Sequence, residues 1–202
     1  MKTVLKIILV IFISISLFSC NKYEEEELKA IQDISNNYLD KNDLQKILNP
    51  PNFSNEIEIE KPDINKLNLK VYISDELRPI MQIKEDNEWM FKNNNMSKKD
   101  SVAYFNLVNS EKFKSLKYRT FDKTKIKFIK PYHYFDYSKQ KLKDGENYNY
   151  LSFSRFCFDE DYNFGVTVID YHVSSNGYSF MGYNMSLLIK KIDGKWKIIA
   201  PK

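Results

Sequence analysis

Two segments of the chain carry apolar residues at the three- and four-residue spacing of an amphipathic helix. The first runs from about Glu25 to about Leu39, and the second begins at Ser97, an N-cap followed three residues later by Asp100. We expect the second helix to end near Leu116. The apolar residues of the two segments are Leu28, Ile31, Ile34, Tyr38 and Leu39, and then Val102, Phe105, Leu107, Val108 and Phe113.

The C-terminal half has the pattern of an antiparallel β-meander. From Ile126 onward it is rich in β-branched and aromatic residues, and short runs of turn residues interrupt it. We expect two earlier strands, at Leu67–Ile73 and around Ile57 and Ile59. The predicted fold class is α+β: an antiparallel β-meander in the C-terminal half packs against two main helices, which cover one face of the sheet. The turn runs are Lys143–Gly145, Asp159–Asp161, Ser174–Gly177 and Asp193–Gly194.

The last predicted hairpin has the clearest register. Its Asp193-Gly194 pair is a preferred two-residue turn because both positions tolerate positive φ. With this turn Ile189 faces Ile198, so one side of the hairpin is apolar. The same register places Lys190 opposite Lys197, and we expect that side to face water.

The preceding strand decides where the candidate site lies. A turn at Asn176-Gly177 places Asp170 and His172 on the same inner face as Tyr183, although a one-residue shift would reverse this. Two residues apart on one strand, Asp170 and His172 would form an acid-oriented imidazole beside the Tyr183 hydroxyl. These three residues are the candidate ligand-binding residues. The alternative is that Asp170 and His172 simply lie at the solvent-exposed end of the sheet or satisfy each other. No catalytic residue is assigned.

Residues 1–19 have the layout of a secretory signal peptide, with a short basic start and an apolar run over Ile7–Phe18. This run is shorter than the roughly 20 residues that a membrane-spanning helix needs. Its end, Leu17-Phe18-Ser19-Cys20, resembles the lipobox of bacterial lipoproteins, in which the cysteine thiol receives a diacylglycerol and the preceding peptide is removed. The resemblance implies that Cys20 is lipidated, begins the mature chain and anchors it to the membrane.

Four glutamates, Glu24–Glu27, follow this cysteine closely. They resemble the acidic tags that direct lipoproteins of some bacteria with two membranes to the outer face of the outer membrane. The alternative is a solvated charge run that favours the positive end of the following helix. We expect a signal peptide over residues 1–19, a lipidated acidic tether over residues 20–27 and one α+β domain over residues 28–202. The expected location is the cell envelope, at the outer membrane and displayed on the surface.

Composition and motifs exclude several classes of function. The net charge of +4, which includes two lysines of the signal peptide, is too small to indicate nucleic-acid binding. His133 and His172 provide no ligand set for zinc, and Asp159–Asp161 is better explained as a turn than as a calcium loop. No phosphate-binding or nucleophile motif occurs, so we expect no metal and no cofactor. Cys157 is expected to be a small buried apolar residue without a disulfide partner.

The absence of a catalytic set favours a non-catalytic envelope lipoprotein that binds an envelope protein or glycan through its sheet or loops. The alternatives are a small hydrolase or isomerase with a pocket around Asp170 and His172, and an immunity or inhibitor protein. The ending Ile192–Ile198 is similar to that of many small secreted bacterial domains, including cone-shaped folds related to nuclear transport factor 2, which implies an α+β fold and no site residue. Tyrosines that can form a sugar- or protein-binding surface, or pack, are Tyr148, Tyr150, Tyr162, Tyr171 and Tyr178.

Overall fold

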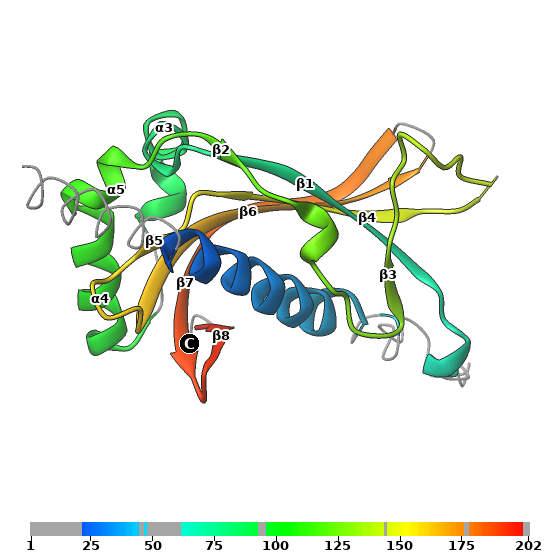
Figure 1. Ribbon diagram of the computed structural model, residues 1–202, viewed down its shortest axis with the longest axis horizontal. Helices are drawn as coiled ribbons and strands as arrows, with labels where there is room; N and C mark the ends of the chain where they lie inside the picture. Colours follow the sequence, from blue (N-terminus) through cyan, green and yellow to red (C-terminus); the bar gives the residue numbers. More distant parts are fainter. Residues whose placement is uncertain are drawn as a thin grey trace, which may run out of the picture.

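The structure, a computed structural model, describes residues 22–44, 47, 62–92, 96–143, 145–175 and 178–199. A long twisted sheet runs through it, in the order β2-β1-β4-β6-β7-β8, with β3 beside β1 and β5 beside β6 (Figure 1). The strands are β1 (Leu69–Arg78), β2 (Arg119–Thr120), β3 (Tyr132–Tyr134), β4 (Tyr148–Ser154), β5 (Cys157–Phe158), β6 (Phe164–Ser175), β7 (Tyr178–Ile192) and β8 (Lys195–Ile198). Strands β4, β6, β7 and β8 form the predicted antiparallel meander, which confirms the α+β class. The sheet is mixed because β1 runs parallel to β3 and β4.

The N-terminal helix covers residues 22–39 and continues into η1 (Asp40–Leu44). The expected second helix is broken in two, because the Ser110 hydroxyl accepts a hydrogen bond from the Phe113 amide and caps a new helix. Within the described part of the chain, no helix is long and apolar enough to cross a membrane. The other helical segments are η2 (Ile64–Lys66), α3 (Ile80–Asp86), η3 (Glu88–Phe91), α4 (Lys98–Val108), α5 (Glu111–Ser115) and η4 (Lys123–Lys125).

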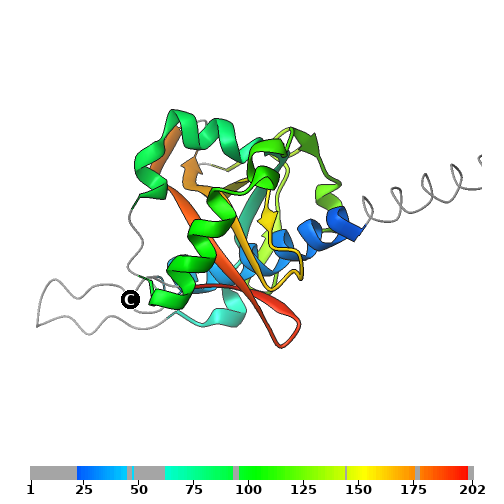
Figure 2. The same ribbon diagram turned by 90° about the vertical axis from the view of Figure 1, so that its left-hand side faces the viewer.

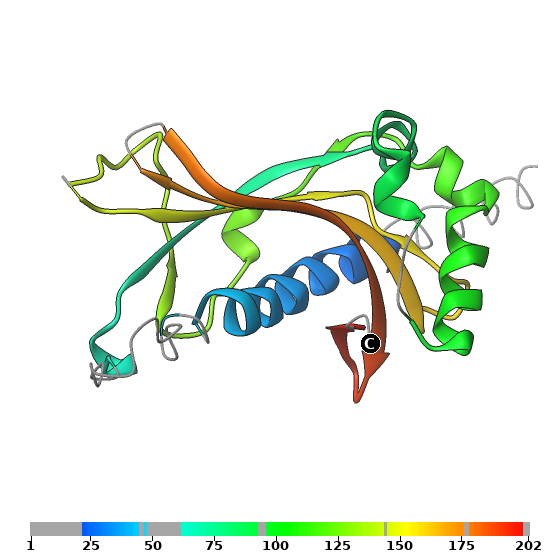
Figure 3. The ribbon, with the colours of Figure 1, turned by 180° about the vertical axis from the view of Figure 1, so that it is seen from behind.

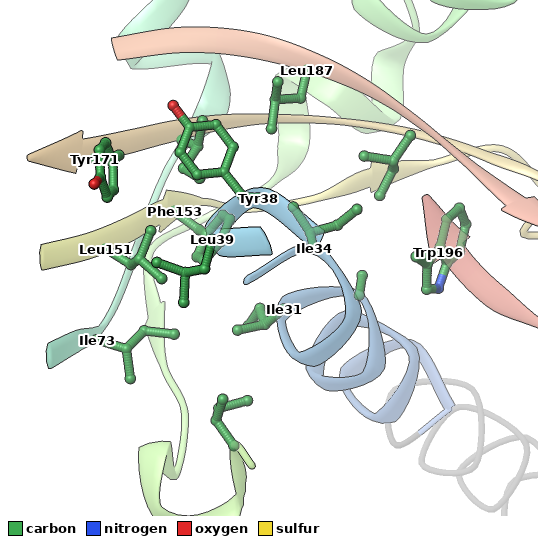
Figure 4. Packing of buried hydrophobic residues seen from close by; sticks show 14 of the residues in the cluster. Ile31, Ile34, Tyr38, Leu39, Ile73, Leu151, Phe153, Tyr171, Leu187 and Trp196 are labelled. Atoms are coloured by element: carbon green, nitrogen blue, oxygen red, sulfur yellow. The ribbon is translucent and has the colours of Figure 1, made fainter. Parts of the chain in front are cut away.

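The larger core lies on the inner face of the sheet, which is the face against the N-terminal helix (Figure 4). The helix contributes side chains spaced three or four residues apart, as its apolar stripe predicted. Its buried apolar residues are Ala30, Ile31, Ile34, Tyr38 and Leu39. The strands contribute Ile73, Leu151, Phe153, Ile169, Leu187, Ile189 and Trp196, among others.

A second core lies on the opposite, outer face, where α3, α4 and α5 gather at one end of the sheet (Figures 1 and 2). The two main helices therefore cover opposite faces, and the prediction that they share one face is wrong. Alternate strand residues turn to alternate faces, so Val168 and Leu188 join this core while Ile169 and Ile189 join the inner one. The predicted stripe of the second helix is only partly buried, since Val102 and Phe105 are exposed.

The final hairpin has the predicted register. Ile189 faces Ile198, Lys190 faces Lys197, and the turn residues Asp193 and Gly194 have φ values of 53° and 76°. Both values lie in the left-handed region that the two-residue turn requires.

The register between β6 and β7 differs from the prediction over most of its length. Ser175 faces Tyr178, as the expected turn requires, but the pairing skips Met181. This β-bulge shifts every later pair by one residue and reverses the faces of β6. Asp170 and His172 consequently lie on the outer face. The prediction that they share an inner face with Tyr183 is wrong.

Glu27 is part of the fold, although it was expected in a water-exposed tether. Its side chain is fully buried, and its Oε1 accepts hydrogen bonds from Arg155 Nε and the Phe156 amide, both at 2.9 Å. Its Oε2 accepts one from Arg119 Nε at 2.7 Å. Burial of this carboxylate is tolerated because two guanidinium groups and a backbone amide compensate its charge.

Glu26 is buried beside it, at 6% exposure, and ties the helix to the last hairpin. It accepts hydrogen bonds from Trp196 Nε1 at 2.8 Å and from Lys191. The expectation of a solvated acidic run is thus wrong for Glu26 and Glu27. Residues 1–21, with the signal peptide and Cys20, lie outside the described part of the chain, as does the predicted strand around Ile57.

Candidate functional site

Asp170 and His172 remain neighbours on the outer face of β6. Their side chains are 35% and 22% exposed, and 3.7 Å separates Asp170 Oδ1 from His172 Nδ1. Val168, two residues before Asp170 on β6, belongs to the second core, but Asp170 and His172 do not. Helices α3, α4 and α5 cover one end of the outer face, and no described helix lies over its other end (Figure 3). The two side chains are therefore neighbours, as predicted, but they lie on the outer face of the sheet and not in the core.

His172 is the end of a row of aromatic side chains that crosses the strands. Tyr72 on β1 pairs with Tyr150 on β4, and Tyr150 pairs with His172 on β6, so the three rings share one face. The Tyr150 and His172 rings are stacked, with centroids 4.3 Å apart and an interplanar angle of 15°. Tyr72 and Tyr150 are stacked at 5.6 Å, and Tyr137 packs against Tyr72 at 4.6 Å. We name Tyr137, Tyr72, Tyr150 and His172 the outer aromatic row.

A tight turn after β3 positions the exposed member of this row. Asp136 Oδ1 accepts hydrogen bonds from the Ser138 amide at 3.1 Å and the Ser138 hydroxyl at 2.6 Å. These bonds hold the pKa of Asp136 below its usual range. Tyr137, between these two residues, is 53% exposed, so the turn presents its ring at the surface.

The two ends of the row differ in charge. At the β1 end, Lys123 Nζ lies 4.8 Å from the centroid of the Tyr72 ring, which is a cation–π contact. At the β6 end stands the carboxylate of Asp170. Burial raises the pKa of Tyr150, and the charge of Asp170 adds to the rise, while hydrogen bonds with Ser152 and Ser74 oppose it. Tyr150 is therefore neutral near pH 7, and its hydroxyl can both donate and accept a hydrogen bond.

The helical cover over the outer face ends between Ser186 and Asn184 of β7. Tyr104 of α4 lies 2.9 Å from the Ser186 hydroxyl, which itself donates a hydrogen bond to the Met90 carbonyl. Asn184, which pairs with Asp170, is exposed, and so is Gly182, the partner of His172. The open part of the outer face thus begins at Asn184.

The other predicted site residues do not join this surface. Tyr183 pairs with Tyr171 on the inner side of the sheet, where Tyr171 is buried. Tyr162 lies in a separate aromatic group with Tyr23 and Phe158. Of the tyrosines singled out in the sequence, Tyr150 and its neighbour Tyr148, stacked against Tyr137, belong to the open outer surface. The side chain of Tyr178 lies outside the described part of the structure.

Tyr72 and Tyr137 were missed by sequence reasoning. The signal for Tyr72 was present, because it lies between the apolar residues Val71 and Ile73 in a predicted strand, and alternation turns it to the opposite face.

His133 lies on β3, where it pairs with Lys70. Burial lowers its pKa, and the positive charge of Lys70 adds to the effect. Cys157 is buried and free, as expected, and burial raises the pKa of its thiol. Among the residues that the structure describes, no cluster of histidine, cysteine, aspartate and glutamate side chains could hold a metal ion.

Two grooves lie elsewhere on the described part of the domain. One of about 450 Å³ lies between the N-terminal helix and β8, where residues such as Asp33, Asn37 and Lys195 line it. Another of about 340 Å³ lies where β1 and β4 begin, beside Lys70 and Glu146. Neither groove is lined by Asp170 or His172, so this pair has no enclosed cavity in either.

Searches against protein-family models, curated proteins and solved structures found no match to this chain. Fold and surface together define an α+β domain with a polar aromatic row on the open half of its sheet.

Proposed function

We propose that this protein is a non-catalytic, lipid-anchored domain of the bacterial envelope that binds a partner through the outer aromatic row. The observation that carries the proposal is the position of the row on the half of the outer face that α3, α4 and α5 leave open. Aromatic residues are enriched at binding surfaces because they offer large contact area together with a polar tip.

The same geometry favours binding over catalysis. A hydrolase or isomerase using Asp170 and His172 needs a concavity that excludes water and holds the substrate against both groups. Both side chains are instead partly exposed on an open sheet face. The ring of His172 is stacked on Tyr150, which fixes its orientation as part of a surface.

The lipid anchor follows from the resemblance of Leu17-Phe18-Ser19-Cys20 to a lipobox. Two or three acyl chains on Cys20 would hold the domain at the membrane. The helix that begins the domain would leave that membrane directly, because Lys22 is already helical. We place the domain at the outer membrane and on its outer surface.

Capture of partners from the native envelope tests the proposal. The full-length lipoprotein with a C-terminal affinity tag is expressed in its own host, cross-linked and purified in detergent. Tyr137→Ala and His172→Ala should each lower the amount of captured partner about tenfold, as loss of a central contact does. Tyr183→Ala is the matched control, because Tyr183 is an exposed tyrosine on the other side of the sheet. Equal capture by all three variants would contradict the proposal.

A further inference from the structure

The longest strand of the sheet has an open edge. β7 has 15 residues, whereas β8, its neighbour on the side away from β6, has four and pairs with residues 189–192. Within the described part of the chain, no other strand lies beside β7 on this side. Figure 3 looks onto this side of the molecule, where β7 passes in front of the other strands. An open edge presents unpaired backbone groups and is a template for another strand.

Three residues of this edge direct their backbone groups outward. The Leu188 carbonyl accepts a hydrogen bond from the Ile199 amide at 2.9 Å, so the backbone groups of Leu188 face away from β6. This direction alternates along a strand, and Ser186, Asn184 and Gly182 therefore face the same way as Leu188. Among the described residues, none supplies these three with a backbone partner on this side. Gly182 and Asn184 are exposed, so the edge is accessible.

We infer that a second copy of this chain pairs with this edge, so that two β7 strands run antiparallel with Asn184 opposite Asn184 of the second copy. In this register Gly182 of each copy faces Ser186 of the other, and the three pairs form about six backbone hydrogen bonds. β8 limits the ladder at one end, and the bulge at Met181 limits it at the other. A ladder centred on Asn184 thus uses the outward groups of all three residues in both copies. The inference goes beyond the proposed function and needs neither the lipid anchor nor the aromatic row.

The composition of the edge favours a second copy as the occupant. Residues 178–189 include no charged side chain and no proline. Lysines and prolines on edge strands prevent pairing between copies in many proteins, and like charges that face each other repel. The open stretch of β7 has neither protection, whereas a charged peptide would gain no ion pair from these residues. The central Asn184 also suits its own copy, since an amide both donates and accepts hydrogen bonds.

This pairing would bring the outer faces of two copies together. Facing residues of an antiparallel pair project to the same side of the sheet, so the two-fold axis is normal to the sheet. Both outer faces then lie on one side of a continuous sheet. Each outer aromatic row would end at His172 on β6, one strand away from the shared edge.

Sedimentation of the full-length lipoprotein in detergent micelles tests the inference. The wild type should form a dimer below about 100 μM, since a small interface binds in the micromolar range. Asn184→Lys should raise the dissociation constant at least about fivefold, because two like charges then face each other. Asn184→Ser, an uncharged change at the same position, is the matched control and should stay within about twofold. Both variants should keep the wild-type circular dichroism spectrum, since Asn184 is exposed.

A cysteine at the same position tests the register. Facing residues of a hydrogen-bonded antiparallel pair have Cα atoms about 5.5 Å apart, which a disulfide can bridge. Asn184→Cys should therefore give a disulfide-linked dimer on a non-reducing gel after mild oxidation, whereas the buried Cys157 should not react. Thr120→Cys is the control and should run as a monomer, because Thr120 is exposed on β2, at the other edge of the sheet.

Several results would overturn the inference. A wild type that remains monomeric at about 100 μM would mean that another protein or another part of this chain occupies the edge. A dimer that Asn184→Lys leaves intact would mean that the copies meet elsewhere. A disulfide formed by Thr120→Cys and not by Asn184→Cys would assign the contact to the opposite edge.

Discussion

Replacing Glu27 by alanine tests whether the acidic segment is part of the folded domain. In the wild type this carboxylate is fully buried and compensated by Arg155, Arg119 and the Phe156 amide. The substitution removes all of these hydrogen bonds at once. Arg155, whose side chain is only 10% exposed, would keep its positive charge inside the domain without the carboxylate beside it.

The size of the effect follows from that uncompensated charge. Removing one partner of a buried ion pair costs about 3–5 kcal/mol, because the remaining charge is still desolvated. For a domain of this size, each kcal/mol lowers Tm by roughly 2–4 °C, so Glu27→Ala should lower Tm by about 6–20 °C. Glu27→Gln should cost less, since the amide oxygen can still accept the Phe156 amide.

Urea unfolding followed by circular dichroism measures the free energy difference. Glu24→Ala is the matched control within the same acidic run. Glu24 also contacts Arg119, at 3.0 Å, but its side chain is 47% exposed, and such surface pairs contribute about 0–1 kcal/mol. The reasoning is refuted if the two variants lose the same stability, because the acidic run would then behave as a solvated tether throughout.

Three further predictions concern the core, the acid sensitivity and the anchor. Ile189→Ala should lower the free energy of unfolding, measured in urea, by about 2–5 kcal/mol because Ile189 is fully buried. Lys197→Ala, on the solvent side, should change the same free energy by less than about 0.5 kcal/mol. The reverse order of the two variants would mean that the register is wrong. Burial alone would raise the pKa of Glu26, but hydrogen bonds from Lys191 and Trp196 lower it below 4.5. Its stabilising contribution is therefore present above pH 4.5 and lost as the pH falls below that value, so Glu26→Gln should flatten the acid limb of a plot of stability against pH. Labelled palmitate should enter the wild-type chain and not Cys20→Ala, and equal labelling would exclude the anchor.

The last hairpin shows how much structure a local pattern determines. Its turn residues, its pairing and its buried side follow from Asp193-Gly194 and from alternation in the flanking strands. No distant contact is needed, because both strands and the turn lie within a few residues of one another. The N-terminal helix was predictable for a similar reason, since its buried stripe has helical spacing.

Long-range relations were less predictable. The apolar stripes show that each main helix covers part of a sheet, but nothing in either stripe says which face it covers. Val102 and Phe105 fit the period of the second helix, yet both are exposed. The buried residues of α4 are Tyr104, Leu107 and Val108, of which Tyr104 was not part of the predicted stripe. Glu27 was the largest surprise, because its partners Arg155 and Arg119 lie far away in sequence and a run of glutamates normally indicates solvent.

The position of the candidate site depends on Met181, the residue that the pairing of β6 and β7 skips, and alternation in the sequence does not reveal this bulge. Near α4, both faces of β6 are buried, and the strand is apolar on both. Val168 and Ile169 are therefore equally apolar, and the sequence does not indicate which of the two side chains belongs to the inner core. Only the far end distinguishes the faces, because there the turn register would place Asp170 and His172 on the inner side, where Tyr38 of the N-terminal helix packs against Tyr171. Burying a carboxylate there without compensation would cost several kcal/mol. Skipping Met181 avoids that cost, buries Tyr171 instead and turns Asp170 and His172 outward, so the bulge that overturned the predicted pocket also produces the open aromatic row.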